Sequence, residues 1–374
     1  MRSQTKQVSQ WQRSVLYVNA NDWFERLLDR IGSARDSIVF EYYIFEADSL
    51  GMRFVAALVA AARRGVRVRV MMDGVGSADS SDLLSEHLHG HGVEVRIYHP
   101  LPWLANSFRW SRHRGGWAYL GLLSILNINR RNHRKLCVID AETAWIGSFN
   151  ISAKHLPKDA GGEGWRDYGV ELNGERVSSL VQGFNSLWSG HKPRLSRGFL
   201  ASYLSNRSLR ARRLKNRFVA RSVANAVQRV WLVNAYFLPT AAMGRALRQA
   251  SRNGTQVCLM LPEYSDVAIF PGLSSLFYRA LMRAGARIFL YQPGVLHAKA
   301  LLVDNFAVLG SSNWNYRSTL HDLELDAVIR SPETLLTLEQ AMLDDAANCR
   351  ELTVEDTPVP SLLSRLLYAV RYWM

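Results

Sequence analysis

Two stretches of the sequence, His133-Arg-Lys135-Leu-Cys-Val-Ile-Asp140 and His297-Ala-Lys299-Ala-Leu-Leu-Val-Asp304, repeat one pattern of histidine, lysine and aspartate with the same spacing. Each stretch is followed by the sequence Gly-Ser-x-Asn, at residues 147–150 and 310–313. A single match can arise by chance, but two matches at equivalent places, each with the same tail, indicate an internal repeat. Most of the chain's 46 basic residues are arginines, yet lysine occupies both motif positions, which indicates that a compact ammonium group is needed there.

The apolar residues after each motif lysine predict a β-strand, in which alternate residues share a face. His133 and Lys135 therefore point the same way, as do His297 and Lys299. The motif aspartates have the opposite parity, so we expect Asp140 and Asp304 to order the hairpin turn, although the motif also makes them candidate catalytic residues. The Gly-Ser-x-Asn segments are expected to begin the return strands and to bring four further side chains beside the histidines: Ser148, Asn150, Ser311 and Asn313.

The sequence around the motifs repeats as well. Buried strands are predicted at 37–45 and 231–239, each after an amphipathic helix, at 23–34 and 214–228. Each strand is followed by a helix that ends at a glycine and by another strand. This alternation predicts an α/β fold of two duplicated lobes, each a mixed sheet flanked by helices, related by a pseudo-two-fold axis and sharing one active site.

The expected domain organisation follows from the repeat. The first lobe covers residues 1–190, a basic linker covers 191–213, and the second lobe covers 214–374. The opening strand of the second lobe is only weakly indicated by the sequence, and residues 199–204 are the best candidate for it. Pro100 lies 33 residues before His133 but Pro293 only four before His297, so the first lobe carries an insertion at about 101–129.

Two histidines that face each other suit phosphodiester transfer, because one can attack phosphorus while the other donates a proton. Two lysines and two asparagines can surround the phosphoryl oxygens and stabilise the charge of the transition state. This chemistry requires neither a metal nor a cofactor, because the ammonium groups supply the positive charge.

Composition narrows the class of protein. The 374 residues have a net charge of +14, 48% hydrophobic residues and three scattered cysteines, which is typical of a globular protein without a disulfide framework. No apolar run is long enough for a membrane span, and the N-terminus lacks the apolar core of a signal peptide. No carboxylate occurs between Glu175 and Glu263, and this basic region favours a polyanionic partner, either nucleic acid or an anionic membrane, unless it is only a solvated surface.

The duplicated motif resembles that of the phospholipase D superfamily, known as HKD, and the chain is most similar to its bacterial cardiolipin synthase branch. The resemblance implies a covalent phosphohistidine and favours His133 as the nucleophile and His297 as the acid/base. It also implies that an acidic residue after each motif, Asp167 or Glu324, orients a histidine. The stretches that carry it, besides the motifs, are Trp165-Arg-Asp167, Asn234-Ala-Tyr-Phe-Leu-Pro239 and Gly310-Ser-Ser-Asn-Trp-Asn-Tyr-Arg-Ser318.

The implied reaction joins two molecules of phosphatidylglycerol, an anionic phospholipid, into cardiolipin and glycerol. Hydrolysis to phosphatidic acid and a phosphatidylserine-forming transfer are close alternatives, and a nuclease of the same superfamily is a more distant one. Nothing in the sequence identifies the acceptor alcohol.

We expect a peripheral protein on the bacterial cytoplasmic membrane, with two segments that contact lipid. One is the insertion, which mixes aromatic, basic and leucine residues as interfacial anchors do. The other is the C-terminal tail, whose apolar positions fall at helical spacing. The anchors are Trp103, Trp110, Trp117, Leu122 and Leu123 in the insertion, and Leu362, Leu363, Leu366, Leu367, Val370 and Trp373 in the tail.

Overall fold

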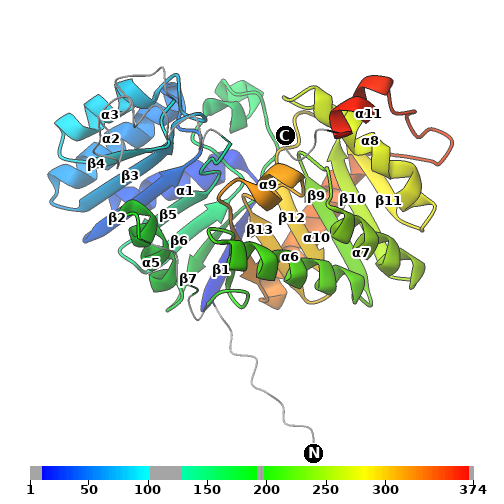
Figure 1. The fold of residues 1–374 in the computed structure, drawn as a ribbon. Helices are drawn as coiled ribbons and strands as arrows, with labels where there is room; N and C mark the ends of the chain where they lie inside the picture. Colours follow the sequence, from blue (N-terminus) through cyan, green and yellow to red (C-terminus); the bar gives the residue numbers. More distant parts are fainter. Residues whose placement is uncertain (1–10, 102–128, 192–194, 196–197, 370–374) are drawn as a thin grey trace, which may run out of the picture.

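The computed structural model describes residues 11–101, 129–191, 195 and 198–369, and its strands form two sheets that lie side by side (Figure 1). The first sheet has the strand order β1-β7-β6-β5-β2-β3-β4. Strands β2, β3 and β4 are parallel, and the other pairings are antiparallel. The strands are β1 (Arg13–Tyr17), β2 (Ser37–Tyr42), β3 (Arg67–Asp73), β4 (Glu94–Tyr98), β5 (Lys135–Ile139), β6 (Thr143–Gly147) and β7 (Gly169–Asn173).

The second sheet repeats this arrangement. Its order, β8-β14-β13-β12-β9-β10-β11-β15, matches the first sheet strand for strand and adds β15 at the edge. The predicted α/β class and its duplication are therefore confirmed. The strands are β8 (Tyr203–Ser205), β9 (Arg229–Asn234), β10 (Gln256–Pro262), β11 (Arg287–Tyr291), β12 (Lys299–Val303), β13 (Phe306–Gly310), β14 (Leu325–Ile329) and β15 (Cys349–Glu351).

Helices cover both faces of the sheets. One face of the first sheet packs on α1 (Ala20–Gly32), α2 (Ser49–Arg63) and α3 (Ser81–Gly90), and the matching face of the second packs on α6 (Leu209–Ala224), α7 (Ala241–Arg252) and α8 (Ile269–Met282). These helices bury one apolar stripe each, as their spacing predicts. The remaining helices are α5 (Val177–Trp188), α9 (Tyr316–Leu320), α10 (Pro332–Ala347) and α11 (Leu362–Ala369), with 3-10 turns η2 (Ala153–His155) and η3 (Lys158–Ala160).

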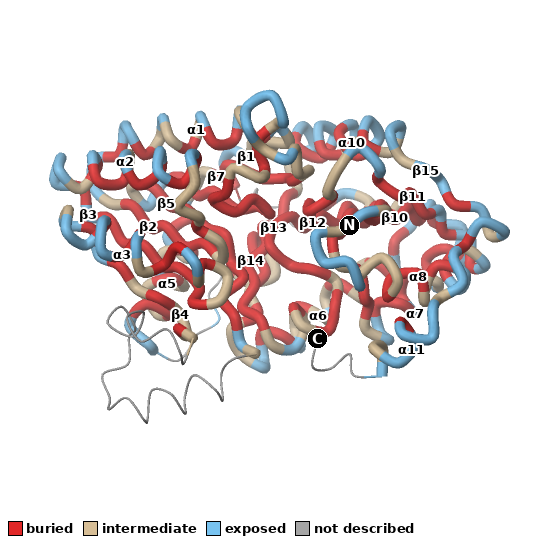
Figure 2. Tube along the Cα trace, turned by 90° about the horizontal axis from the view of Figure 1, so that it is seen from above, coloured by how far each residue is buried: buried red, intermediate tan, exposed pale blue. Residues whose placement is uncertain are grey.

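A single hydrophobic core joins the two lobes. It contains residues of both sheets, such as Leu136 and Ile146 from the first and Leu309 and Leu325 from the second, together with the inner faces of α5 and α10. Figure 2 shows the buried trace running through the centre of the molecule at β7, β13 and β14, with exposed segments on the outer sides of α1, α2 and α10. The lobes are thus held together by buried apolar surface as well as by the chain connection.

The segment between the lobes has more regular structure than predicted. The expected linker, 191–213, contains β8 and the first turn of α6, because the Ser208 side chain caps that helix well before the predicted start at 214. The weak strand expected at 199–204 overlaps β8, which pairs with β14. Nearly all of the predicted insertion, 102–128, lies outside the described residues.

Candidate active site

The two motif histidines occupy equivalent places in the two sheets. His133 and Lys135 lie at the start of β5, which pairs with β2 so that Lys135 is opposite Tyr42. His297 and Lys299 lie at the start of β12, which pairs with β9 so that Lys299 is opposite Asn234. Both imidazoles are buried, with 8% of His133 and 3% of His297 exposed.

The backbone next to each histidine is hydrogen-bonded to the other lobe. The N–H of His133 donates to Leu323 O at 3.0 Å, and the N–H of Leu323 donates to Arg131 O at 2.8 Å. The same pair of bonds recurs around the second histidine, because the His297 N–H donates to Arg166 O at 2.8 Å and the Arg166 N–H donates to Val295 O at 2.8 Å. Both histidines therefore lie at the seam between the lobes.

Each histidine is held by the acid of the opposite lobe. His133 Nδ1 lies 3.1 Å from Glu324 Oε2 and 3.1 Å from Ser311 O, while His297 Nδ1 lies 2.8 Å from Asp167 Oδ1. A carboxylate and a carbonyl only accept hydrogen bonds, so the ring hydrogen of His133 is on Nδ1. His297 Nδ1 also faces a carboxylate oxygen, so its ring hydrogen is on Nδ1 as well. The Nε2 atom of each ring is then the lone-pair nitrogen.

Burial controls the charges of these groups. Loss of water around the ring lowers the pKa of His133 to about 4, with a further contribution from the Lys135 ammonium, and burial also lowers the pKa of His297. Burial alone would raise the pKa of Glu324, but His133 and Ser311 lower it to about 2. At neutral pH the site thus pairs neutral imidazoles with ionised carboxylates.

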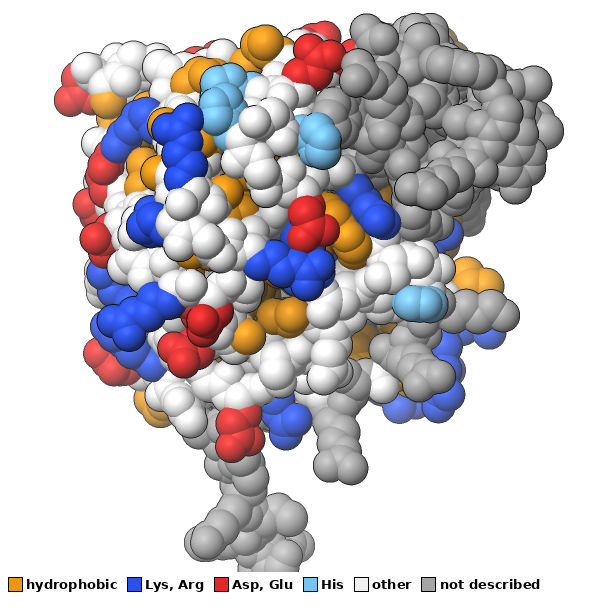
Figure 3. Space-filling view, turned by 90° about the vertical axis from the view of Figure 1, so that its left-hand side faces the viewer, with side chains coloured by type: hydrophobic (Ala, Val, Ile, Leu, Met, Phe, Trp, Pro, Cys, Tyr) orange, Lys and Arg blue, Asp and Glu red, His pale blue; other side chains and the backbone are white. Residues whose placement is uncertain are grey.

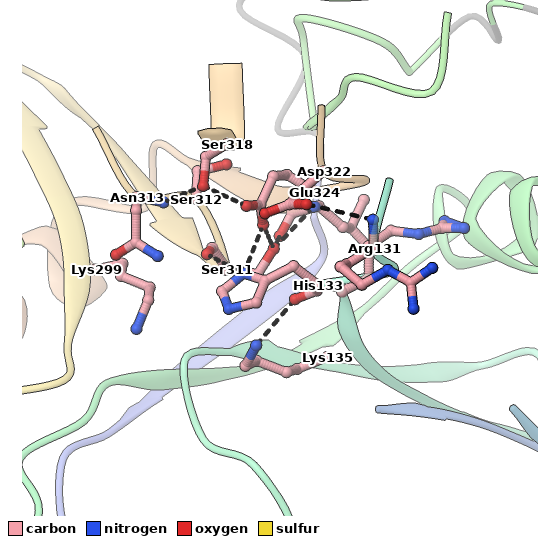
Figure 4. Close-up of polar contacts among 12 residues, drawn as sticks. Arg131, His133, Lys135, Lys299, Ser311, Ser312, Asn313, Ser318, Asp322 and Glu324 are labelled. Carbon is pink, nitrogen blue, oxygen red and sulfur yellow. Dashed lines mark hydrogen bonds and ion pairs between the residues drawn. The ribbon is translucent and has the colours of Figure 1, made fainter. Parts of the chain in front are cut away.

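The two motif lysines come from different lobes and point toward a common space with His133 and Asn313 (Figure 4). Burial and, to a smaller extent, the nearby charge of Lys299 together lower the pKa of Lys135 to about 7, while burial lowers the pKa of Lys299 to about 8. Each ammonium donates to the carbonyl of its own motif histidine, at 2.9 Å for Lys135 and 2.5 Å for Lys299. Two buried ammonium groups that face a common space (Figure 4), with the charge of Lys299 acting on Lys135, favour an anionic ligand in that space.

The Gly-Ser-x-Asn segments end the return strands, so the prediction that they begin them was wrong. Strands β6 and β13 start directly after the hairpin turn and end at Gly147 and Gly310. A Cβ atom on Gly147 would lie 2.7 Å from Gly169 Cα, and one on Gly310 would lie 2.4 Å from Leu325 O. Only glycine permits this close strand pairing, which brings the following serine and asparagine to the seam.

The four Gly-Ser-x-Asn side chains are all buried but have unequal partners. Ser311 Oγ donates to Glu324 Oε2 at 2.5 Å, whereas Ser148 Oγ donates to Tyr168 O at 3.2 Å and contacts no acid among the described residues. The Oδ1 atoms of Asn150 and Asn313 are buried without a hydrogen-bond partner. Unsatisfied amide groups at equivalent places in both lobes suit contact with a ligand.

Comparison with known proteins agrees with this geometry. A family model described as cardiolipin synthase, PLD-like domain, matches residues 27–188 and 219–345. The chain belongs to this cardiolipin synthase family. It is 30% identical to cardiolipin synthase A of Pseudomonas putida (strain GB-1), over 91% of this chain and 70% of that protein. It is 28% identical to the cardiolipin synthase of Clostridium perfringens (strain 13), over 94% of this chain and 74% of that protein.

The solved structure of phosphatidylserine synthase from Haemophilus influenzae shares the fold of this family member. The TM-score is 0.71 at 13% sequence identity, over 97% of this chain and 96% of that one. A similarity that spans both chains almost completely supports the two-lobed architecture.

The aspartates of the family motif lie away from the histidines. Asp140 accepts hydrogen bonds from the backbone N–H groups of Arg35, Asp36 and Ser37, and Asp304 accepts them from 227–229 in the same way. Both aspartates are at the opposite end of their strands from the histidines, and both have positive φ, of 53° and 45°. They fix the chain at the start of β2 and β9 instead of ordering the hairpin turn, and their place away from the histidines agrees with the opposite parity of the motif positions.

Sequence reasoning missed four residues that surround the histidines of this cardiolipin synthase family member. The Tyr43 ring lies 4.8 Å from that of His133, and the Tyr236 ring 6.2 Å from that of His297. His155 and Ser318 bind the second oxygens of Asp167 and Glu324. The strand register equates Tyr43 with Ala235, so the repeat gave no signal for the tyrosines.

His155, Asp167 and His297 form a group with metal-ligand chemistry, but their hydrogen bonds do not suit a metal. The Asn150 backbone N–H donates to His155 Nε2 at 3.1 Å, so His155 Nδ1 carries the hydrogen and donates to Asp167 Oδ2 at 2.7 Å. His297 Nδ1 occupies the other carboxylate oxygen. A metal at this place would have to displace both N–H groups from the carboxylate.

The basic region is only partly a surface feature. In α6, Arg210, Arg213, Arg217 and Arg221 are exposed, whereas Lys215 is buried and donates to Asp326 Oδ2 at 2.7 Å. On the side of the first lobe seen in Figure 3, basic and acidic side chains are mixed. The exposed α6 arginines thus form a stripe along one helix, at a spacing that places them on one face.

Proposed function

We propose that this protein is a phosphatidyltransferase of the cardiolipin synthase type, which joins two phosphatidylglycerols into cardiolipin and glycerol through a phosphohistidine and without a metal. The observation that carries the proposal is the crossed arrangement of two imidazoles, each held through Nδ1 by a carboxylate of the other lobe. Family membership supplies the lipid substrate class.

In the first step, His133 Nε2 attacks the phosphorus of the first phosphatidylglycerol. The bond from phosphorus to the glycerol oxygen breaks, and that oxygen takes a proton from the imidazolium form of His297. The Asp167 carboxylate stabilises this imidazolium, and the negative charge of the bound phosphodiester raises the pKa that burial lowers in the empty site.

In the second step, the headgroup hydroxyl of a second phosphatidylglycerol attacks the phosphohistidine. Its proton passes to His297, the P–N bond to His133 breaks, and cardiolipin forms. Lys135 and Lys299 balance the charge on the phosphoryl oxygens, and the side-chain N–H groups of Asn150 and Asn313 donate to the same oxygens.

Protein incubated with a chelator, and with either phosphatidylglycerol vesicles or DNA, tests the proposal. Cardiolipin and glycerol as products support it. Phosphatidic acid as the only lipid product would make the protein a hydrolase, and cut DNA with unchanged lipid would make it a nuclease. His133→Ala and His297→Ala should each remove the activity, and turnover in both single variants would contradict the two-histidine mechanism.

We further propose that the protein reaches its substrate as a peripheral membrane protein. No helix in the part of the chain that the structure describes is long and apolar enough to cross a bilayer. In α11, Leu362, Leu363 and Leu366 are exposed, whereas Leu367 packs against the small core that contains Leu273 and Tyr316. The exposed leucines are available for lipid contact, while the insertion anchors at 103–123 and the tail residues Val370 and Trp373 lie outside the described residues.

A further inference from the structure

His155 uses both of its ring nitrogens inside the protein. It lies in the turn η2, is 2% exposed, and packs against the rings of Trp165 at 5.5 Å and Phe149 at 5.7 Å. Its Nε2 accepts the backbone N–H of Asn150 at 3.1 Å, and its Nδ1 donates to Asp167 Oδ2 at 2.7 Å. The backbone donor fixes the tautomer, because a hydrogen on Nε2 would point at another hydrogen.

The second lobe contains the same relay with a different side chain. The backbone N–H of Asn313 donates to Ser318 Oγ at 3.3 Å, and Ser318 Oγ donates to Glu324 Oε1 at 2.6 Å. His155 and Ser318 each lie five residues after the motif asparagine. Both relays therefore connect an asparagine of one lobe, through that lobe's acid, to the histidine of the other.

The two relays leave the catalytic histidines in unequal positions. His297 and His155 both bind Asp167, but each imidazole donates to a different carboxylate oxygen. The distance from His297 Nδ1 to Asp167 Oδ1 is short, at 2.8 Å. His133 shares Glu324 Oε2 with Ser311, and its N–H is divided between that oxygen and Ser311 O, both at 3.1 Å. A carboxylate oxygen with a single imidazole partner stabilises a positive charge on that ring better than a shared oxygen does.

We infer that His155 is a positioning residue that makes His297 the acid/base of the reaction. By holding Asp167 Oδ2, it directs Oδ1 at His297, the ring that must carry a positive charge when the leaving group departs. His133, with its divided hydrogen bond, remains the neutral ring that attacks phosphorus. The inference rests on the proposed two-histidine mechanism and adds the residue that distinguishes the two roles.

Two substitutions separate the contacts of His155. In His155→Asn the amide nitrogen replaces Nδ1 and keeps the bond to Asp167, whereas in His155→Gln the amide reaches the Nε2 position and keeps only the bond to the Asn150 backbone. We expect His155→Gln to lower kcat for lipid transfer by about 10–100-fold with little change in KM, because loss of a group that orients a ligand has this order of effect. His155→Asn should retain most of kcat, and the exposed His87→Gln is the matched control.

The leaving group identifies which histidine is affected. p-Nitrophenolate leaves phosphorus without a proton, so with bis-(p-nitrophenyl) phosphate the first burst of product does not need His297 as an acid. The burst rate of His155→Gln should stay within about threefold of the wild type, while its later steady-state rate falls with that of lipid transfer. A burst slowed as much as the steady state would mean that His155 acts on the nucleophile, and would overturn the inference.

A measurement on the wild-type protein covers the case in which the variants do not fold. In ¹⁵N-histidine NMR spectra, His155 should give the signals of a neutral ring with hydrogen on Nδ1. A ring with hydrogen on Nε2 would overturn the inference. The nitrophenyl ester also separates the two proposals, because a wild-type protein that cleaves it but makes no cardiolipin contradicts only the lipid reaction, whereas equal activity of His155→Gln and wild type contradicts only the role of His155.

Discussion

In the proposed mechanism Lys135 and Lys299 must both be charged to bind a phosphodiester, so we expect them to set the alkaline limit of activity. Burial lowers the pKa of Lys135 to about 7 and that of Lys299 to about 8, and burial lowers that of His133 to about 4. Lysine loses its charge as the pH rises through its pKa, and the nucleophile becomes protonated as the pH falls through its own. The pH profile of kcat/KM with bis-(p-nitrophenyl) phosphate, whose leaving group needs no proton from His297, should therefore be bell-shaped with limbs near 4 and 7.

Lys135→Arg is the variant that assigns the alkaline limb. Arginine stays charged at every pH used, so the limb should move toward the value of Lys299, even though the bulkier side chain lowers the rate. A wild-type profile that stays flat up to pH 9.5 would show that neither lysine limits binding.

Asp140 should matter for stability and not for chemistry. Burial alone would raise its pKa, but the backbone N–H groups of Ser37, Asp36 and Arg35 lower it, so it stabilises the fold above its unfolded pKa and loses this effect as the pH falls through the lowered value. Asp140→Asn keeps a side chain that tolerates positive φ and should cost about 1–2 kcal/mol while changing kcat by less than about threefold. Thermal unfolding and kinetics below the transition check this, with Asp167→Asn as the control that should lose activity. A loss of kcat in Asp140→Asn comparable to that control would make Asp140 a catalytic residue.

The residues that sequence could identify are those fixed by the repeat. His133, Lys135, His297 and Lys299 share one spacing and one strand face, which alone predicts their convergence. His155 and Ser318 could not be found in this way, because they are different residue types. Their common role, a hydrogen bond from the backbone N–H of an asparagine to a side chain that binds an acid, is visible only in the structure. The crossing of acids between lobes was also hidden, since it depends on how the sheets meet.

At the scale of elements, α11 offers a surface whose role can be tested separately from catalysis. The helix packs on α8, where the Tyr368 and Phe277 rings lie 5.7 Å apart, and it leaves Leu362, Leu363 and Leu366 more than 60% exposed. Replacing these three leucines by serine should weaken binding to phosphatidylglycerol vesicles by about tenfold or more, since each buried side chain contributes about 1.5–3 kcal/mol. Turnover of bis-(p-nitrophenyl) phosphate should be unchanged.

Leu336→Ser on α10 is the control for this change, because Leu336 is 66% exposed on a different helix. It should leave vesicle flotation as in the wild type. Equal binding by the triple variant and the wild type would exclude α11 as a lipid contact.

Strand and helix types followed from periodicity, but three boundaries did not. Both β6 and β13 begin within three residues of the motif aspartate, because positive φ at Asp140 and Asp304 makes the turn tighter than the sequence indicated. Helix α6 begins early because its basic first turn is capped by Ser208 and buries Ala211 and Arg212, a tertiary packing that a charged run does not reveal.

At the scale of the whole molecule, the lobes share one core and should unfold together. That core includes strands of both sheets, and the seam adds the backbone bonds of Leu323 and Arg166 to the opposite lobe. Calorimetry should show one transition whose calorimetric and van't Hoff enthalpies agree. Two separable transitions would mean that the halves are independent domains.

Leu323→Ala tests the link between this seam and catalysis. Leu323 is fully buried in the shared core and its carbonyl accepts the His133 N–H at 3.0 Å. The cavity should cost about 2–5 kcal/mol and lower the melting temperature of the single transition without splitting it. Activity well below that temperature should fall as well, because a shifted seam moves His133 relative to His297 and a displacement of about 1 Å costs on the order of 100-fold in rate.

Leu232→Ala is the control, because Leu232 is equally buried but lies within the second lobe's own core. It should lower stability and leave kcat within about threefold of the wild type. Equal losses of kcat in both variants would show that the seam has no special part in aligning the two histidines.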